Sequence, residues 1–153
     1  MKTIKIVVLA LLGVVFALTV SQAQDYKHPK GLINKDGKVF SPEGEHMGWI
    51  TKDGIIKDTA GVKIAHIDAE GSLVDAKTGK KQGKMEKNGN YVLYPTKTPD
   101  EKWSVSPPMN GVCEVKNSKG ETIVEVHENY KQQGACAYHC LSMQKQGKKM
   151  KMK

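Results

Sequence analysis

The chain has 153 residues, including 24 lysines, no arginine and 16 acidic residues, and its formal net charge at pH 7 is +8. Residues 25–144 hold 17 of the lysines and all of the acidic residues, so the body of the chain is nearly neutral and most of the excess charge lies in residues 145–153. Arginine supplies the bidentate donors that read phosphates and bases, so its absence argues against specific nucleic-acid binding. The length suits one domain.

Residues 1–24 have the three parts of a secretory signal peptide. Lys2 and Lys5 give a positive start, and residues 6–20 are an almost unbroken apolar run. Residues 21–23 then place small side chains at a cleavage site. We therefore expect a secreted or periplasmic protein, exported by this segment; the alternative is an uncleaved N-terminal anchor. A bilayer span needs about 20 apolar residues, so we expect no transmembrane segment in the mature chain.

A heptad pattern recurs along the next part of the chain. Four segments align without gaps and end in glycine, namely residues 31–37, 48–54, 65–71 and 83–89. Their final glycines are 17, 17 and 18 residues apart. A fixed short period indicates one supersecondary unit that is used repeatedly.

Turn signals punctuate these repeats and predict β-hairpins. Asp36-Gly37, Asp53-Gly54 and Asn88-Gly89 favour tight two-residue turns, in which both central residues need positive φ, and Glu70-Gly71 is a weaker copy. Between them, residues 41–44 and 58–61 match type I turns, and residues 75–79 carry one extra residue. The sequence therefore predicts short strands joined by two alternating kinds of turn.

One face of each repeat pairs a tiny residue with a bulky one. The tiny residues are Gly31, Gly48, Ala65 and Gly83, and the bulky residues two positions later are Ile33, Ile50, Ile67 and Met85. Further apolar residues stand two positions after each turn glycine, at Val39, Ile56, Leu73 and Tyr91. Residues two apart share a strand face, and a tiny residue there indicates close backbone approach. We expect the strands to converge toward an axis.

The C-terminal third departs from the repeat. Residues 94–111 contain four prolines and predict a long connection with at most one edge strand. A degenerate fifth unit follows up to His127. Asn129 is a candidate N-cap for a helix from Tyr130 to about Lys145 that stops near Gly147.

These elements predict a mainly β fold, in which about five hairpin units of roughly 17 residues surround an axis and one C-terminal α-helix packs on them. The predicted organisation is a signal peptide at residues 1–24, a hairpin region at 25–127, a helix of the same domain at 128–146, and a basic disordered tail at 147–153.

The repeats, the signal peptide and the C-terminal motifs together resemble the five-fold β-flower proteins, a family of small secreted bacterial proteins. The motifs are Cys113-Glu114-Val115, the run from Val126 to Lys131, and the run from Gly134 to Leu141. The resemblance covers roughly residues 30–145. It implies a closed or nearly closed five-fold β architecture and implies no activity.

Cysteine and histidine form the main constellation with chemical potential. Cys136, His139, Cys140 and Met143 share one stripe of the predicted helix, and Cys113 begins a strand. One interpretation is a zinc or copper site formed by Cys113, Cys136, His139 and Cys140. A second is a disulfide between Cys113 and either Cys136 or Cys140, and a third is three buried thiols.

No phosphate loop, metalloprotease motif or serine-nucleophile motif occurs in the sequence. We therefore expect a secreted, non-enzymatic structural or binding module of the bacterial cell envelope without a cofactor. The alternative is a thiol or metal-binding protein that uses the helix stripe. Trp49, His66 and Trp103 are candidate binding-surface residues, and the lysine-rich tail is a candidate contact to an anionic envelope surface or glycan.

Overall fold

The computed structural model describes residues 30–94 and 101–152. The predicted signal peptide lies outside the described residues. The described elements are β1 (Gly31–Ile33), β2 (Lys38–Phe40), β3 (His46–Ile50), β4 (Ile55–Asp58), β5 (Lys63–Ile67), β6 (Ser72–Asp75), β7 (Lys81–Met85), β8 (Tyr91–Leu93), β9 (Lys102–Val105), β10 (Val112–Lys116), β11 (Thr122–His127), the 3₁₀-helix η2 (Glu128–Tyr130) and the α-helix α2 (Gly134–Lys151).

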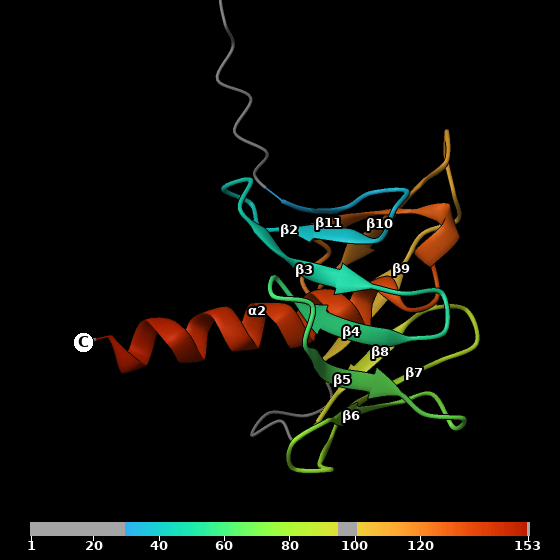
Figure 1. The fold of residues 1–153 in the computed structure, drawn as a ribbon. Coiled ribbons are helices and arrows are strands. Elements are labelled where there is room, and N and C mark those ends of the chain that lie inside the picture. Colours follow the sequence, from blue (N-terminus) through green and yellow to red (C-terminus); the bar gives the residue numbers. More distant parts are fainter. Residues whose placement is uncertain (1–29, 95–100, 153) are drawn as a thin grey trace, which may run out of the picture.

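The described strands form one closed barrel in chain order (Figure 1). Every strand pairs antiparallel with its neighbours in sequence, and β1 closes the barrel by pairing parallel with β11. The closing register places Gly31 opposite Val124 and Ile33 opposite Val126. An odd number of alternating strands leaves the first and last pointing the same way, so the closure must be parallel. The mainly β fold with one C-terminal helix is confirmed, but the continuous pairing does not by itself divide the barrel into five units.

A single kind of turn joins most neighbouring strands. In the first, the Gly37 N–H donates to the Asn34 carbonyl at 3.0 Å and the Asn34 N–H donates to the Lys38 carbonyl at 3.1 Å. Gly37 has φ 78°, whereas Asp36 does not have positive φ. This is a three-residue loop, a type I turn followed by a left-handed glycine. The same bonds recur around Gly44, Gly54, Gly61, Gly71, Gly89 and Gly120.

The predicted alternation of two turn types, with tight two-residue turns at Asp-Gly and Asn-Gly, is therefore wrong. Both loop types place a left-handed glycine after a polar residue, so the dipeptide alone does not separate them. A two-residue turn with positive φ at both central residues occurs instead at Asn110 and Gly111, between the bridged residues Met109 and Val112. It lies in the predicted long connection, which also contains β9.

Side chains at the first turn position explain why this loop recurs. The Asn34 Oδ1 accepts hydrogen bonds from the backbone N–H groups of Asp36 and Lys38, both at 3.0 Å. The carboxylate of Asp68 and the amide of Asn117 do the same two and four residues ahead. Asn and Asp stabilise turns in this way because their short polar side chains reach their own backbone.

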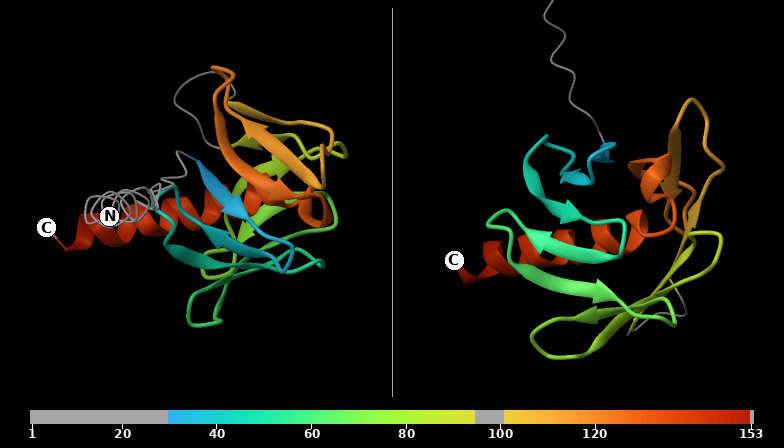
Figure 2. Two further views of the ribbon diagram at one scale, coloured as in Figure 1. Left: turned by 90° about the horizontal axis from the view of Figure 1, so that it is seen from above. Right: turned by 45° about the vertical axis from the view of Figure 1, so that its right-hand side comes forward.

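The helix α2 lies inside the barrel rather than on it. All eight residues from Gly134 to Leu141 are buried, on every side of the helix, and the C-terminal part of α2 protrudes from one end (Figures 1 and 2). A helix buried on all sides must be enclosed by other elements. The helix predicted to pack on the hairpins does contact them, but the strands surround its N-terminal half instead of lying on one side of it. None of the described helices is long and apolar enough to span a bilayer.

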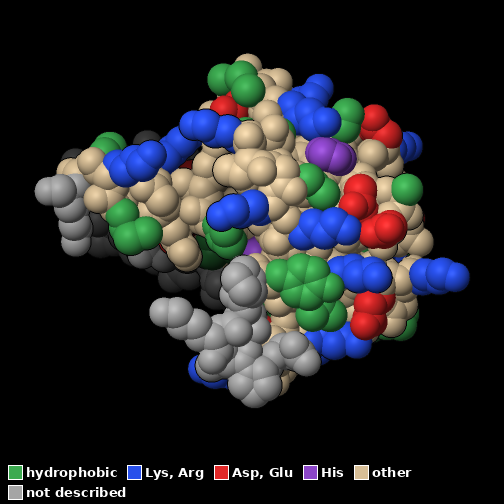
Figure 3. Space-filling view, turned by 90° about the horizontal axis from the view of Figure 1, so that it is seen from below, with side chains coloured by type: hydrophobic (Ala, Val, Ile, Leu, Met, Phe, Trp, Pro, Cys, Tyr) green, Lys and Arg blue, Asp and Glu red, His purple; other side chains and the backbone are tan. Residues whose placement is uncertain are grey.

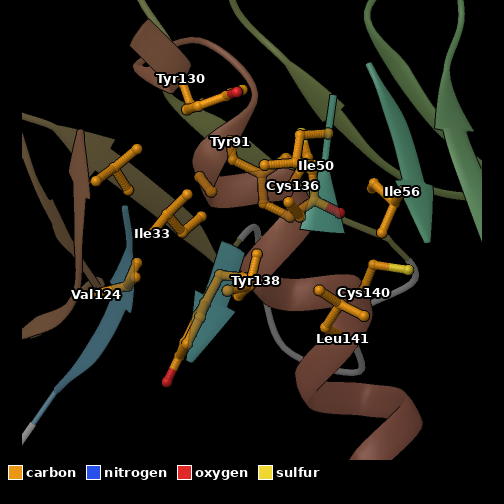
Figure 4. Packing of buried hydrophobic residues seen from close by; sticks show 14 of the residues in the cluster. Ile33, Ile50, Ile56, Tyr91, Val124, Tyr130, Cys136, Tyr138, Cys140 and Leu141 are labelled. Atoms are coloured by element: carbon orange, nitrogen blue, oxygen red, sulfur yellow. The ribbon is translucent and has the colours of Figure 1, made fainter. Parts of the chain in front are cut away.

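Inward-pointing strand side chains fill the space around α2. Fully buried residues at the predicted apolar positions include Ile33, Val39, Ile50, Ile56, Leu73 and Tyr91. Several of them surround Cys136 and Leu141 of the helix (Figure 4). Ile67 and Met85 are only partly buried and pack against this core. Burying such side chains is the main stabilising term, at about 1.5–3 kcal/mol for each large one.

Two of the predicted tiny residues, Gly31 and Gly48, lie against side chains of the helix. A Cβ added to Gly31 would collide with the ring of Tyr138, and one added to Gly48 would approach the Leu141 Cδ2 within 2.9 Å. A Cβ at Gly83 would instead collide with the ring of Tyr91 on the neighbouring strand β8, so the expected close approach involves strand as well as helix side chains.

The helix boundaries differ from the prediction. The His127 Nδ1, not Asn129, caps η2 by accepting from the Asn129 N–H at 3.2 Å. The α-helix begins at Gly134 and continues past Gly147 to Lys151, so residues 147–151, predicted as a disordered tail, are helical. Lysine and methionine are good helix formers, and lysines in the last turn interact favourably with the helix dipole.

Candidate functional site

A cleft of about 730 Å³ opens at the end of the barrel from which α2 protrudes. Its walls come from α2, from the strands β8, β9 and β11, and from turns at this end of the barrel. The side chains most relevant to binding are Glu101, Trp103, Glu121, Tyr138, His139 and Met143. Small-molecule sites generally have this size and this mixture of apolar walls with a few polar groups. We call it the mouth cleft.

His139 is the most constrained polar residue of the mouth cleft. It projects from α2, is only 7% exposed, and its Nδ1 lies 2.8 Å from the hydroxyl oxygen of Tyr91. The Tyr91 hydroxyl also lies 3.3 Å from the carbonyl of Gln82, to which it donates. Both contacts are satisfied when His139 carries its proton on Nδ1 and donates it to Tyr91. The Nε2 atom is then an acceptor, and no described residue forms a hydrogen bond with it.

An aromatic cluster holds the imidazole in place. The ring of His139 lies 5.6 Å from the ring of Trp103 in an edge-to-face arrangement and 5.3 Å from that of Tyr91. Trp103 contacts Tyr91 at 6.0 Å, and its indole N–H donates to the Glu101 carboxylate at 3.3 Å. Burial lowers the pKa of His139 to about 4, and the nearby Glu101 only partly opposes this shift. The imidazole is therefore neutral near pH 7.

The structure separates the three predicted binding-surface residues. Trp103 lines the mouth cleft, whereas Trp49 lies half-buried on β3, where it packs against the ring of His46 at 4.3 Å. Trp49 is paired across the strands with Lys38 and Lys57. His66 lies on β5, and its Nδ1 is buried without a hydrogen-bond partner among the described residues. Trp49 and His66 do not line the mouth cleft.

All three cysteines, which lie in the described part of the chain, are buried and free. Cys113 lies on β10 opposite Val126 of β11, whereas Cys136 and Cys140 lie on α2 inside the barrel. Burial raises the pKa of each thiol, and that of Cys140 reaches about 12, to which the charge of Asp75 contributes. These groups are protonated thiols near pH 7 rather than thiolates, which are the nucleophilic and metal-binding form.

The predicted metal-ligand set is not assembled. Within residues 30–94 and 101–152, no group of three or more His, Cys, Asp or Glu side chains is arranged to hold a metal ion. Cys136 is fully buried in the core, and the imidazole of His139 is hydrogen-bonded to Tyr91. Cys113 lies near the charges of Lys131 and Glu128, on the segment that leads into α2, and these charges influence its pKa. The helix stripe is divided between core packing and the mouth cleft, which His139 and Met143 both line.

Sequence reasoning missed Tyr91, Glu101 and Tyr138 as site residues. One signal was present at Tyr91, which is the only hydroxyl-bearing residue in the series Val39, Ile56, Leu73 and Tyr91. A buried tyrosine hydroxyl usually requires a partner. Its partner lies 48 residues away on another element, so no local pattern could identify it.

Comparison of this chain with protein-family models, with curated proteins and with solved structures finds no match.

Proposed function

We propose that this protein is an exported, non-enzymatic binding module of the bacterial cell envelope that holds a small ligand in the mouth cleft. One observation carries the proposal. The interior of the barrel is occupied by α2, while a cleft of about 730 Å³ lies at the mouth, lined by Trp103 and His139. A ligand would therefore bind in the mouth cleft and not inside the barrel.

Two features favour binding over catalysis. The cleft walls are rigid, because Trp103, Tyr138 and His139 are all more than nine-tenths buried and packed into the core. Rigid walls lower the entropic cost of binding. In addition, His139 with a pKa of about 4 is a weak general base near pH 7, and the raised pKa values of the thiols make them weak nucleophiles.

The repeat pattern supports a finer proposal about architecture. We infer that the barrel derives from about five hairpin units of roughly 17 residues, as in the β-flower proteins that the sequence resembles. The regular spacing of Gly37, Gly54, Gly71 and Gly89, which are 17, 17 and 18 residues apart and lie in the same kind of turn, supports this interpretation. A circular dichroism and folding study of a chain with one 17-residue unit deleted tests it: loss of the cooperative fold is expected if every unit is needed to close the barrel.

The protruding end of α2 is proposed to contact an anionic envelope surface. Lys145 forms ion pairs with Glu43 and Glu45, but Lys148, Lys149 and Lys151 form none within the described part of the chain. Figure 3 shows lysines on the protruding part at the left and side chains of both charges over the barrel. Reversing these three lysines to glutamate should abolish sedimentation with anionic lipid vesicles at low salt, with neutral vesicles as the control.

The binding proposal is tested with a single-tryptophan protein. The chain has two tryptophans, so Trp49→Phe leaves Trp103 as the only indole reporter, in the cleft. A panel of small sugars, amines, amino acids and carboxylates is titrated while tryptophan emission is recorded. A saturable change is expected for at least one compound class, and the Trp103→Phe protein, which keeps Trp49, should not report it. A panel without any saturable response would contradict the proposal.

Export is tested separately by cell fractionation and intact mass. Cleavage after about residue 24 and recovery outside the cytoplasm are expected. A full-length mass in the cytoplasmic fraction would show that residues 1–24 do not direct export.

A further inference from the structure

The charge of the mouth cleft is opposite to that of the chain. Although the protein has 24 lysines and a net charge of +8, no lysine is among the described residues that line this cleft. Its two charged side chains are the carboxylates of Glu101 and Glu121. A locally negative cleft in a positively charged protein favours a cationic ligand and disfavours an anionic one.

The acceptors of the cleft are suited to a group that donates several hydrogen bonds. His139 is neutral, and with its proton on Nδ1 its Nε2 is an acceptor without a described partner. The Glu101 carboxylate lies close enough to influence His139 and is oriented by the Trp103 N–H. A protonated amine has donors and no acceptor, so it can satisfy both groups together.

The aromatic walls favour the same ligand. The face of a tryptophan ring attracts a cation, and the neutral imidazole beside it does not repel one. Trp103 and Tyr138 are each 8% exposed, so only part of each ring is available for contact. Ile123 and Met143 add apolar surface to the cleft, which can receive the organic part of a ligand.

We propose that the mouth cleft binds small organic amines in their protonated form, with Glu101 as counterion, His139 Nε2 as hydrogen-bond acceptor and Trp103 as aromatic wall. This inference rests on the proposed binding function and specifies the chemical class of its ligand.

The test compares three compounds that share a phenyl group but differ in charge. Phenethylamine is protonated near pH 7, 2-phenylethanol is a neutral analogue, and phenylacetate is an anion. Each is titrated into the Trp49→Phe protein, with emission from Trp103 as the readout. We expect the amine to bind at least about fivefold more tightly than the alcohol, the difference that one cation–π or charge-assisted contact provides, and phenylacetate to bind most weakly.

Two variants locate the effect. Glu101→Gln should weaken binding of the amine toward that of the alcohol and leave binding of the alcohol unchanged. Glu114→Gln, on β10 outside the cleft, is the matched control and should change neither. Equal affinity for the amine and the alcohol, or tighter binding of phenylacetate, would overturn the amine inference while the binding function stands. The amine inference is also overturned if none of the three compounds binds but another class in the panel of sugars, amines, amino acids and carboxylates does. If no compound in that panel binds, the proposed binding function itself is wrong.

Discussion

The ring of Tyr138, on the helix inside the barrel, occupies the space that any side chain at Gly31 would need. A Cβ at residue 31 would fall within 2.7 Å of the tyrosine Cζ and 2.9 Å of its hydroxyl oxygen. Because Gly31 pairs with Val124 across the closing strands, this contact joins the first strand, the last strand and the helix. A single glycine thus couples closure of the barrel to the position of its helix.

Replacing Gly31 by leucine should lower the free energy of unfolding by about 2–3 kcal/mol, because the new side chain and the Tyr138 ring compete for one space. Urea unfolding followed by circular dichroism measures this loss. The double variant Gly31→Leu/Tyr138→Ala should recover part of it, since the alanine vacates that space. A double variant whose loss is the sum of the two single losses would show that the residues are not coupled.

The two glycines of α2 should respond oppositely to alanine. A Cβ at Gly134 would lie 2.5 Å from a methyl group of Val126, whereas one at Gly147 meets nothing. Gly134→Ala should therefore destabilise the protein by about 1–3 kcal/mol. Gly147→Ala should stabilise it by about 0.5–1 kcal/mol, because the helix extends past residue 147. Thermal melts of both variants against the parent provide the comparison, and destabilisation by Gly147→Ala would contradict the helical assignment of this segment.

The sequence identifies the strands and most of the inward-facing positions, because Ile33 and Ile50 recur with the repeat, as do Val39 and Ile56. It also contains a signal for the enclosed helix that periodicity analysis overlooks. Residues 134–141 are apolar or small around most of the helix, and a helix of that kind is buried on every side. A single apolar stripe predicts only that the helix packs on the hairpins through one face.

Lowering the pH should destabilise the folded protein through His139. The pKa of a histidine in an unfolded chain is about 6.5, and burial lowers it to about 4 in the folded state. Between these values the unfolded chain binds more protons, so stability rises with pH. The stability that depends on neutral His139 is fully present above about pH 6.5. It is lost as the pH falls toward 4, and the free energy of unfolding decreases by about 2–4 kcal/mol in total.

Urea titrations at about pH 7 and about pH 4.5 of the parent and of His139→Gln isolate this term, because glutamine does not titrate. The carboxylates with lowered pKa values, such as Glu43 at about 2, remain charged over most of this range and are common to both proteins. An equal loss of stability in both proteins would exclude His139 as the cause.

The three cysteines should be unreactive in the folded protein. Burial raises the pKa of Cys113, Cys136 and Cys140, and only the thiolate reacts quickly with disulfide reagents. Thiol titration with a chromogenic disulfide should detect almost no thiol under native conditions and three thiols in denaturant. A single thiol in denaturant would instead establish one disulfide among these residues, and intact mass before and after reduction would confirm it.

The composition of the site was less predictable than the fold. The sequence predicts Trp103 and His139 as site residues, but for different sites: Trp103 for a binding surface and His139 for a metal site. The contact between the Trp103 and His139 rings depends on the path of the chain from β9 to α2 and on which face of α2 lies toward the mouth cleft. Both are set by tertiary packing around Tyr91 rather than by spacing along the chain.

Parallel closure also constrains the order of assembly. The first strand is synthesised early but can complete its pairing only after the last strand exists, so the contact of largest sequence separation in the wall forms late. A ring sealed before the helix is placed would require the lysine-rich end to be threaded through it, and native topologies avoid threading. We therefore expect the strands to close around a helix that is already in place, with the pairing of Gly31 and Val124 among the last contacts to form.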